Sequence, residues 1–212
     1  MPTSLRILAI CVLIFLALTD LKKNGRRATR WREYTFLLLC VAVAVLYGIA
    51  NDQITSRISW EYFYYGKELS PILGPDVPPN PAALHWQAAR IVAAATWWTG
   101  LIAGVAILFA NNPSPRRPQL PYSRLAACLP MIVFITAIFA SIFGIAGNHD
   151  LLNSISPDFR DMAALNLWHP HHFMTAYGIH LGGYMGGVMA TIYGVWSIIS
   201  ERRRRNNHVS PC

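Results

Sequence analysis

Charged residues are scarce in this sequence, and acidic residues are scarcer than basic ones. Only 13% of the 212 residues are charged, with ten Asp and Glu against eighteen Lys and Arg, while 54% are hydrophobic. Ordinary soluble domains carry roughly 25% charged residues. The composition therefore indicates an integral membrane protein, and the length allows a single membrane domain over 1–212.

Several functional signatures are absent. The sequence contains no GxSxG nucleophile elbow, no GxxxxGK[ST] phosphate loop and no HExxH motif. The four cysteines form no CxxC pair, so neither a disulfide framework nor a zinc knuckle is indicated. The net charge of +8 would suit a nucleic-acid partner, but the basic residues form clusters between apolar segments, which excludes that interpretation.

Five apolar segments approach the roughly 20 residues that a helix needs to span a bilayer. Lipid offers no hydrogen-bond partner to the backbone, so these segments must be helical, and the fold class is an all-α integral membrane protein. We expect the first segment to be a retained helix, and a cleaved signal peptide is the alternative. The segments are 5–20, 34–50, 90–110, 125–147 and 176–199.

Charge is distributed unevenly between the connections. Thirteen of the eighteen basic residues lie in 22–32, 116–124 and 202–205, whereas seven of the ten acidic residues lie in the two long connections, 51–89 and 148–175. Lys and Arg mark the cytoplasmic face of a membrane protein. We therefore expect an inner-membrane protein with its N-terminus outside, its C-terminus in the cytoplasm and both long connections outside.

The two long connections share a pattern that suggests an internal duplication. Asn51 aligns with Asn148, and Glu61 with Asp158, at an offset of 97 residues, and His85 aligns with His180 at an offset of 95. Helices two and three would then repeat helices four and five directly. Chance recurrence of small and apolar residues is the alternative.

One outer motif resembles that of a family of uncharacterised bacterial multi-pass membrane proteins. It comprises Asp52-Gln53-Ile54-Thr55, Ile58-Ser59 and Glu61-Tyr62-Phe63. That family has a His before the Asp and a Pro before the Glu, where this chain has Asn51 and Trp60. The resemblance implies a similar number of helices and no particular activity.

Histidines and carboxylates gather in the outer connections, and together they are the ligands of zinc, copper or iron. We therefore expect a transition-metal site there. The alternatives are histidines bound to water and lipid headgroups, and a solvated ionic network in which Arg57, Lys67 and Arg160 pair with the carboxylates. The candidate ligands are His149, Asp150, His169, His171, His172, Asp52, Glu61 and Asp158.

His180 lies within the last apolar segment, where an ionisable side chain is costly unless it faces protein or water. Tyr177 and Tyr184 stand at i−3 and i+4 and so are expected on the same helix face. One interpretation is a buried histidine bonded to tyrosine. The other is a cofactor site formed by these three residues and His85, in which the two histidines are axial ligands of a haem.

Small residues recur at four-residue spacing on the last helix, including Gly178, Gly182 and Gly186, and they allow close helix packing. Gly100 and Gly104 on the third helix are a candidate counterpart. The glycine face could pack within the chain or bind another membrane protein.

Together these observations predict a lipid-embedded protein with an outward-facing polar site that binds a metal, a cofactor or a polar ligand. The competing class is a non-catalytic subunit of a membrane complex. A small membrane enzyme or transporter is the third.

Overall fold

The computed structural model describes residues 3–25, 28–114, 117–152 and 167–209, and this part of the chain is helical apart from its turns and a single bridge between Ser114 and Arg117. The all-helical prediction is confirmed for these residues. The helices are α1 (Thr3–Asn24), α2 (Arg30–Ile58), η2 (Tyr62–Gly66), α3 (Ser70–Leu73), α4 (Pro81–Ala110), α5 (Tyr122–Ala126), α6 (Leu129–Asn148) and α8 (Pro170–Val209).

Three stretches in the described part of the chain are long and apolar enough to cross a membrane: α2, α4 and the segment Tyr122–Asn148 that contains α5 and α6. They support a lipid bilayer as the environment. The predicted segments 5–20 and 176–199 also form helix, in α1 and α8, but neither is among these three. In α8 the many glycines and tyrosines, which are less apolar than Leu or Ile, lower the hydropathy of the central part.

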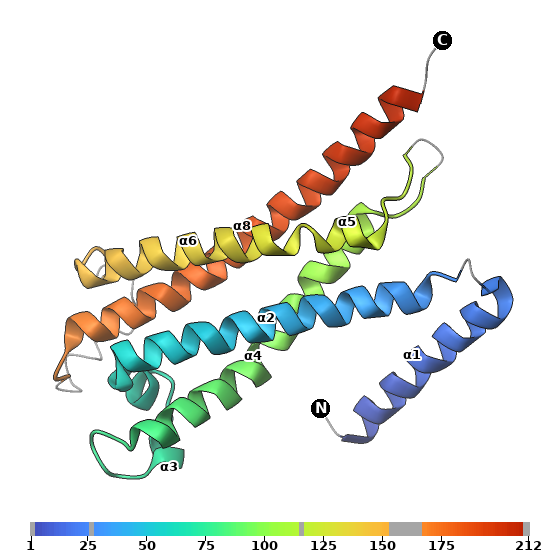
Figure 1. The fold of residues 1–212 in the computed structure, drawn as a ribbon. Coiled ribbons are helices and arrows are strands. Elements are labelled where there is room, and N and C mark those ends of the chain that lie inside the picture. The colour runs from blue at the N-terminus through green and yellow to red at the C-terminus, as the bar shows by residue number, and fades with distance from the viewer. Residues whose placement is uncertain (1–2, 26–27, 115–116, 153–166, 210–212) are drawn as a thin grey trace.

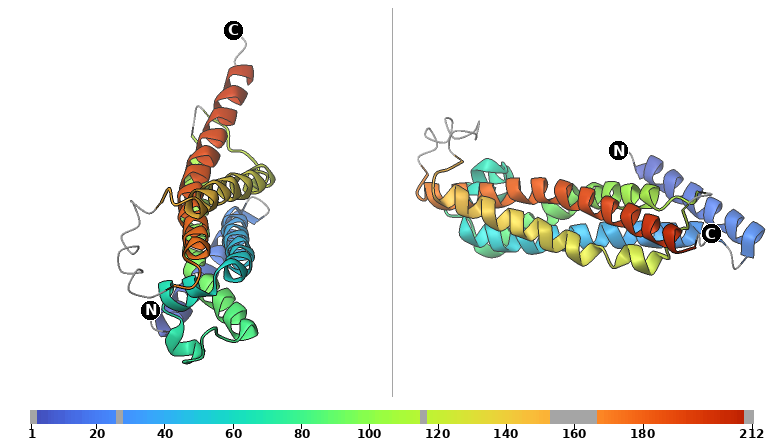
Figure 2. Two further views of the ribbon diagram at one scale, coloured as in Figure 1. Left: turned by 90° about the vertical axis from the view of Figure 1, so that its left-hand side faces the viewer. Right: turned by 90° about the horizontal axis from the view of Figure 1, so that it is seen from above.

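Four of the long helices form two antiparallel hairpins, α2 with α4 and α6 with α8 (Figure 1). Figure 2 shows the elongated bundle from two further sides. Contacts of α8 with α2 and α4 join the hairpins, and α1 contacts α2. The order of the hairpins agrees with a duplication of one helix pair, which stays a prediction.

The bundle has two chemically different ends. At the acidic end, on the left in Figure 1, α2 and α6 finish and α4 and α8 begin, and Asp52, Glu61 and Asp150 lie there. The basic end, on the right, holds the start of α2, the end of α4 and the arginines at the end of α8. The charge segregation of the sequence is therefore also a segregation in space.

The helices at the acidic end extend beyond the apolar segments. α2 continues to Ile58, and α4 begins at Pro81, where Asn80 accepts hydrogen bonds from the amides of Ala82 and Ala83 at 3.0 and 3.2 Å. Asn at an N-cap and Pro in the first turn both favour this start. The first outer connection is consequently shorter than the sequence predicted.

Glycines allow α6 and α8 to pack closely. A Cβ added at Gly178 or Gly182 would overlap the carbonyl oxygens of Phe143 and Phe139, and one added at Gly186 would lie 2.7 Å from the Cβ of Phe139. Of the two interpretations of this face, the structure shows packing within the chain, because α6 covers it.

The predicted counterpart of this face also needs correction. Gly100 and Gly104 lie against α2, where an added Cβ would meet Ala44 at 2.8 Å and Leu37 at 2.9 Å, respectively. Each hairpin thus uses its own small residues for close contact between its two helices.

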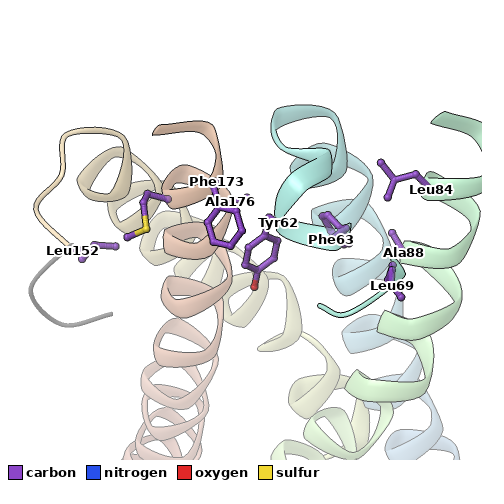
Figure 3. Close-up of a cluster of buried hydrophobic side chains, with 9 residues drawn as sticks. Tyr62, Phe63, Leu69, Leu84, Ala88, Leu152, Phe173 and Ala176 are labelled. Carbon is purple, nitrogen blue, oxygen red and sulfur yellow. The ribbon is translucent and has the colours of Figure 1, made fainter. Parts of the chain in front are cut away.

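A buried apolar cluster fills the acidic end and joins both hairpins (Figure 3). η2 contributes Tyr62 and Phe63, α4 contributes Leu84, and α8 contributes Phe173. The rings of Tyr62 and Phe173 meet edge to face at 5.3 Å. This cluster holds η2 against α8 and so positions the polar side chains beside it.

The basic end is closed by one buried arginine. Arg202 is 5% exposed, and its guanidinium donates to the carbonyl oxygens of Pro118 and Arg117, each at 2.9 Å, and to those of Ala110 and Asn112. It therefore ties α8 to the end of α4 and to the connection that follows.

We predict that Gly182→Ala lowers the unfolding free energy by about 1–3 kcal/mol, because the added methyl group overpacks the contact with Phe139. Gly183→Ala is the matched control, since nothing lies within 4 Å of a Cβ at that position and alanine has the higher helix propensity. Thermal unfolding in a mild detergent measures both variants. Equal midpoints for the two would contradict the close contact.

Candidate functional site

The outer motif forms a turn in which α2 ends and the chain reverses. Ser59 follows α2 in an extended conformation, and its hydroxyl accepts a hydrogen bond from the Tyr62 amide at 3.1 Å. The next residues form the π-helical turn η2, with Tyr62 and Phe63 buried. Such turns are frequent at functional sites. The turn places Lys67 back against α2.

Asp52 is the central residue of the candidate site. It lies on the last turns of α2, is 1% exposed, and has Nε2 of His180 at 3.6 Å from Oδ1 and Nζ of Lys67 at 3.8 Å from Oδ2. Within the described part of the chain, neither carboxylate oxygen accepts a well-formed hydrogen bond. A buried carboxylate with incomplete hydrogen bonding is costly, so this residue is the strongest candidate for a functional group.

His180 reaches the site from α8 and is 7% exposed. Its Nε2 lies 3.3 Å from the Thr55 hydroxyl, and its ring stacks on Tyr62 with centroids 4.9 Å apart. His180 is therefore buried, as one of its two interpretations expected, but the hydrogen-bond partner is Thr55 rather than a tyrosine. The partners are residues of α2 and η2, and the predicted companion Tyr184 is 61% exposed.

Tyr177 is half-buried at the edge of the apolar cluster. Of the three residues that helical spacing placed on one side of α8, only His180 is buried, whereas Tyr177 is partly buried and Tyr184 is exposed.

Lys67 completes the site. Its side chain is 19% exposed, and its Nζ lies 5.7 Å from the ring centroid of Tyr62 and 5.5 Å from that of Phe63, within the range of cation–π contacts. Burial lowers the pKa of Lys67 below its usual value, and the nearby Asp52 carboxylate opposes this shift. Lys67 therefore belongs to a buried site, contrary to the interpretation of a solvated ionic network.

Glu61 has a structural role at the start of α8. Its carboxylate is 1% exposed and accepts hydrogen bonds from the amides of Trp168 at 2.6 Å and His169 at 3.1 Å, directly before the helix begins at Pro170. A negative charge at a helix N-terminus is favourable. Because the carboxylate already accepts these two hydrogen bonds, we no longer count Glu61 among the candidate metal ligands.

His85 lies on another side of α2. Its Nδ1 is 2.8 Å from the Ser56 hydroxyl, while His180 contacts Thr55. Successive residues of a helix point about 100° apart. The two imidazoles therefore contact different sides of α2, and the prediction that they are the axial ligands of one haem is not supported by this geometry.

Four further histidines, His149, His169, His171 and His172, are exposed at the acidic end. Nδ1 of His171 lies 3.5 Å from Asp150, and the rings of His169 and His172 have centroids 5.3 Å apart. His149 is exposed after α6, and Asp158 lies outside the described residues. No group of three or more His, Cys, Asp or Glu side chains in the described ranges could hold a metal ion, so metal binding is not supported.

The site brings together three side chains that can each gain or lose a proton. A neutral imidazole nitrogen can accept a hydrogen bond from a protonated carboxyl, and an ionised Asp52 can pair with the ammonium of Lys67. The positions of Asp52 and His180 were candidates from sequence, and the pairing of Lys67 with an outer carboxylate was one of the alternatives, whereas the role of Thr55 was missed. Thr55 could have been found from its i+3 spacing to Asp52, but the position of Lys67 depends on how η2 turns.

Comparison with known proteins found no matching family model, no matching curated protein and no matching solved structure.

We predict that Glu61→Gln lowers the unfolding free energy by about 1–3 kcal/mol, because an amide has one acceptor oxygen for two buried N–H groups and carries no charge. Glu68→Gln is the control, since Glu68 is exposed. Hydrogen exchange at the amides of Trp168 and His169 should accelerate only in the Glu61 variant. Unchanged exchange at these amides would show that Glu61 does not cap α8.

Proposed function

We propose that this chain is a multi-pass membrane protein that binds and releases a proton at the Asp52–His180–Lys67 site on its outward-facing side. The observation that carries the proposal is the buried Asp52 carboxylate, which lies 3.6 Å from an imidazole and 3.8 Å from an amine without a well-formed hydrogen bond in the described residues. Ionisable groups at this depth in a membrane protein mark proton or ligand sites.

A proton suits this site better than a larger ligand. The Tyr62 ring stacks directly on His180, and Phe63 lies beside it with centroids 6.0 Å apart, so aromatic side chains cover the imidazole. Two of the three ionisable groups are potential metal ligands, which is fewer than a typical transition-metal site uses. Protonation of Asp52 would create an O–H donor toward His180 and remove a buried negative charge.

The alternative role as an assembly subunit gains no support from the Gly178, Gly182 and Gly186 face, because α6 covers it. A proton-binding site is compatible with a transporter or with an enzyme, and the proposal does not choose between them.

We propose further that the chain spans the membrane five times, with the N-terminus and the acidic end outside and the basic end in the cytoplasm. The separation of acidic and basic residues to opposite ends of the bundle supports this orientation.

We therefore expect a reporter fused after Arg205 to lie in the cytoplasm and a reporter inserted at Pro78 to lie outside. A reporter that works only in the cytoplasm should be active at Arg205, and one that works only outside should be active at Pro78. Alkaline phosphatase and a fluorescent protein that folds only in the cytoplasm are suitable reporters. Both positions reporting the same side would contradict this orientation.

The proton site is tested by infrared difference spectroscopy of the purified protein between two pH values. We expect a carboxyl band that is shifted from those of exposed carboxyls, because Asp52 is shielded from water. Asp52→Asn should remove this band, and Asp76→Asn, which alters an exposed carboxyl, should leave it in place. His180→Gln should shift the band by changing the group closest to Oδ1.

Persistence of the shifted band in Asp52→Asn would refute the assignment. A spectrum without any buried carboxyl band that titrates would refute proton binding at the site. Circular dichroism of each variant confirms that the helical fold is retained, so loss of the band in a folded protein reports on the site itself.

A further inference from the structure

A groove of about 390 Å³ runs along α8 toward the basic end of the bundle, where Ala106 of α4 also lines it. It follows α8 from Thr191 to Arg203, a distance of about 18 Å at the rise of an α-helix. Among the described residues, none that lines the groove belongs to the proton site around Asp52. The groove is therefore a separate feature of the molecule.

The groove changes from apolar to cationic along its length. Nearly all of its lining residues lie on α8, so their order along the groove follows their order in the sequence. The hydroxyl of Thr191, at the inner end, donates to the Gly187 carbonyl of its own helix at 2.8 Å and so needs no further partner. Ser200 and Arg203 line the end that points to the C-terminus. The apolar side chains between these two ends include Ile192, Val195 and Ile199.

Arg203 is exposed and has no acidic partner within the described part of the chain. Glu201 is close in sequence, but two residues along a helix correspond to about 200° of rotation, so it points away from Arg203. The Glu201 carboxylate is also occupied, with Arg124 at 3.1 Å and Arg205 at 2.8 Å. The exposed Arg204 adds further positive charge. This end of the groove therefore attracts an anion.

Aromatic side chains indicate where this end of the groove meets the bilayer surface. Trp196 lines the groove one turn before Ser200, is exposed, and lies 5.9 Å from Tyr193 between ring centroids. Trp31 is exposed at the start of α2, at the same end of the bundle. Tryptophan and tyrosine are enriched where a membrane meets water. With Trp196 at that level, Arg203 lies near the lipid phosphates.

We propose that this groove binds an anionic phospholipid. One acyl chain would lie against the apolar side chains, and the headgroup phosphate would accept hydrogen bonds from Arg203 and Ser200. The planar guanidinium group matches a phosphate in geometry and charge. A zwitterionic headgroup fits less well, because its ammonium group would meet Arg203 and Arg204, while Glu201 already pairs with two arginines. The proposal requires a membrane-embedded chain but neither the orientation nor the proton site proposed above.

Binding is tested by native mass spectrometry of the full-length protein in detergent, mixed with phosphatidylglycerol and phosphatidylcholine that have identical acyl chains. We expect one phosphatidylglycerol per chain to be retained in preference to phosphatidylcholine. Arg203→Gln should weaken the binding of phosphatidylglycerol about five- to tenfold. Arg204→Gln is the charge-matched control, since it removes the same charge from an exposed residue outside the groove, and it should bind nearly as the unaltered protein does.

A second pair of variants tests the apolar part of the groove. Ala106→Phe adds a ring that fills the groove from α4 and leaves every arginine in place, so it should reduce the binding of phosphatidylglycerol. Ala94→Phe adds the same ring at an exposed position of α4 outside the groove and should not reduce it.

Equal losses in Arg203→Gln and Arg204→Gln would show attraction to the charge of the whole tail and would overturn the proposal. Equal retention of the two lipids by the unaltered protein, or equal binding by Ala106→Phe and Ala94→Phe, would also overturn it. Displacement of phosphatidylglycerol by inorganic phosphate at equal concentration would show an anion site without a lipid chain, again contradicting the proposal. Asp52→Asn should bind phosphatidylglycerol as the unaltered protein does, so this proposal and the proton-site proposal fail separately.

Discussion

The hydrogen bonds from the start of α8 to the Glu61 carboxylate are the interaction on which the acidic end depends. They join the turn after α2 to a helix that begins more than a hundred residues later, with amide-to-carboxylate distances of 2.6 and 3.1 Å. The edge-to-face contact of Trp60 with Trp168 at 5.7 Å supports the same junction. With the start of α8 fixed there, His180 lies a few turns further along, level with Asp52 and Thr55.

Close helix packing provides the second constraint. Because the α6–α8 contact leaves no room for a Cβ at Gly178 or Gly182, the register between these helices is narrowly defined. Gly100 has the same role between α4 and α2. The two hairpins then meet mainly through α8, and a groove lies between α2 and α6. The helices are therefore closely packed within each hairpin, whereas a groove separates α2 of one hairpin from α6 of the other.

The buried site contains ionisable side chains, each of which would be costly to bury alone. An isolated Asp52 or Lys67 would carry a large desolvation cost, and their separation of 3.8 Å offsets part of it. Tyr62 and Phe63 add a favourable surface for the ammonium of Lys67. Buried charges seldom contribute much to stability when a well-packed apolar core could replace them, which supports a functional reason for keeping them here.

The sequence alone determined the features that depend on local chemistry. The apolar segments predicted the helices, the charge clusters predicted the chemically different ends, and His180 stood out because an ionisable group is costly inside an apolar segment. Helical spacing could not show which side of α8 is covered, so it grouped His180 with the exposed Tyr184 and left open whether the glycine face packs within the chain or against a partner. Those choices, and the approach of Lys67 to Asp52, depend on contacts between segments far apart in the chain. Only the packing of α2, η2, α6 and α8 decides them, because burial is a property of neighbouring elements rather than of a residue's own helix.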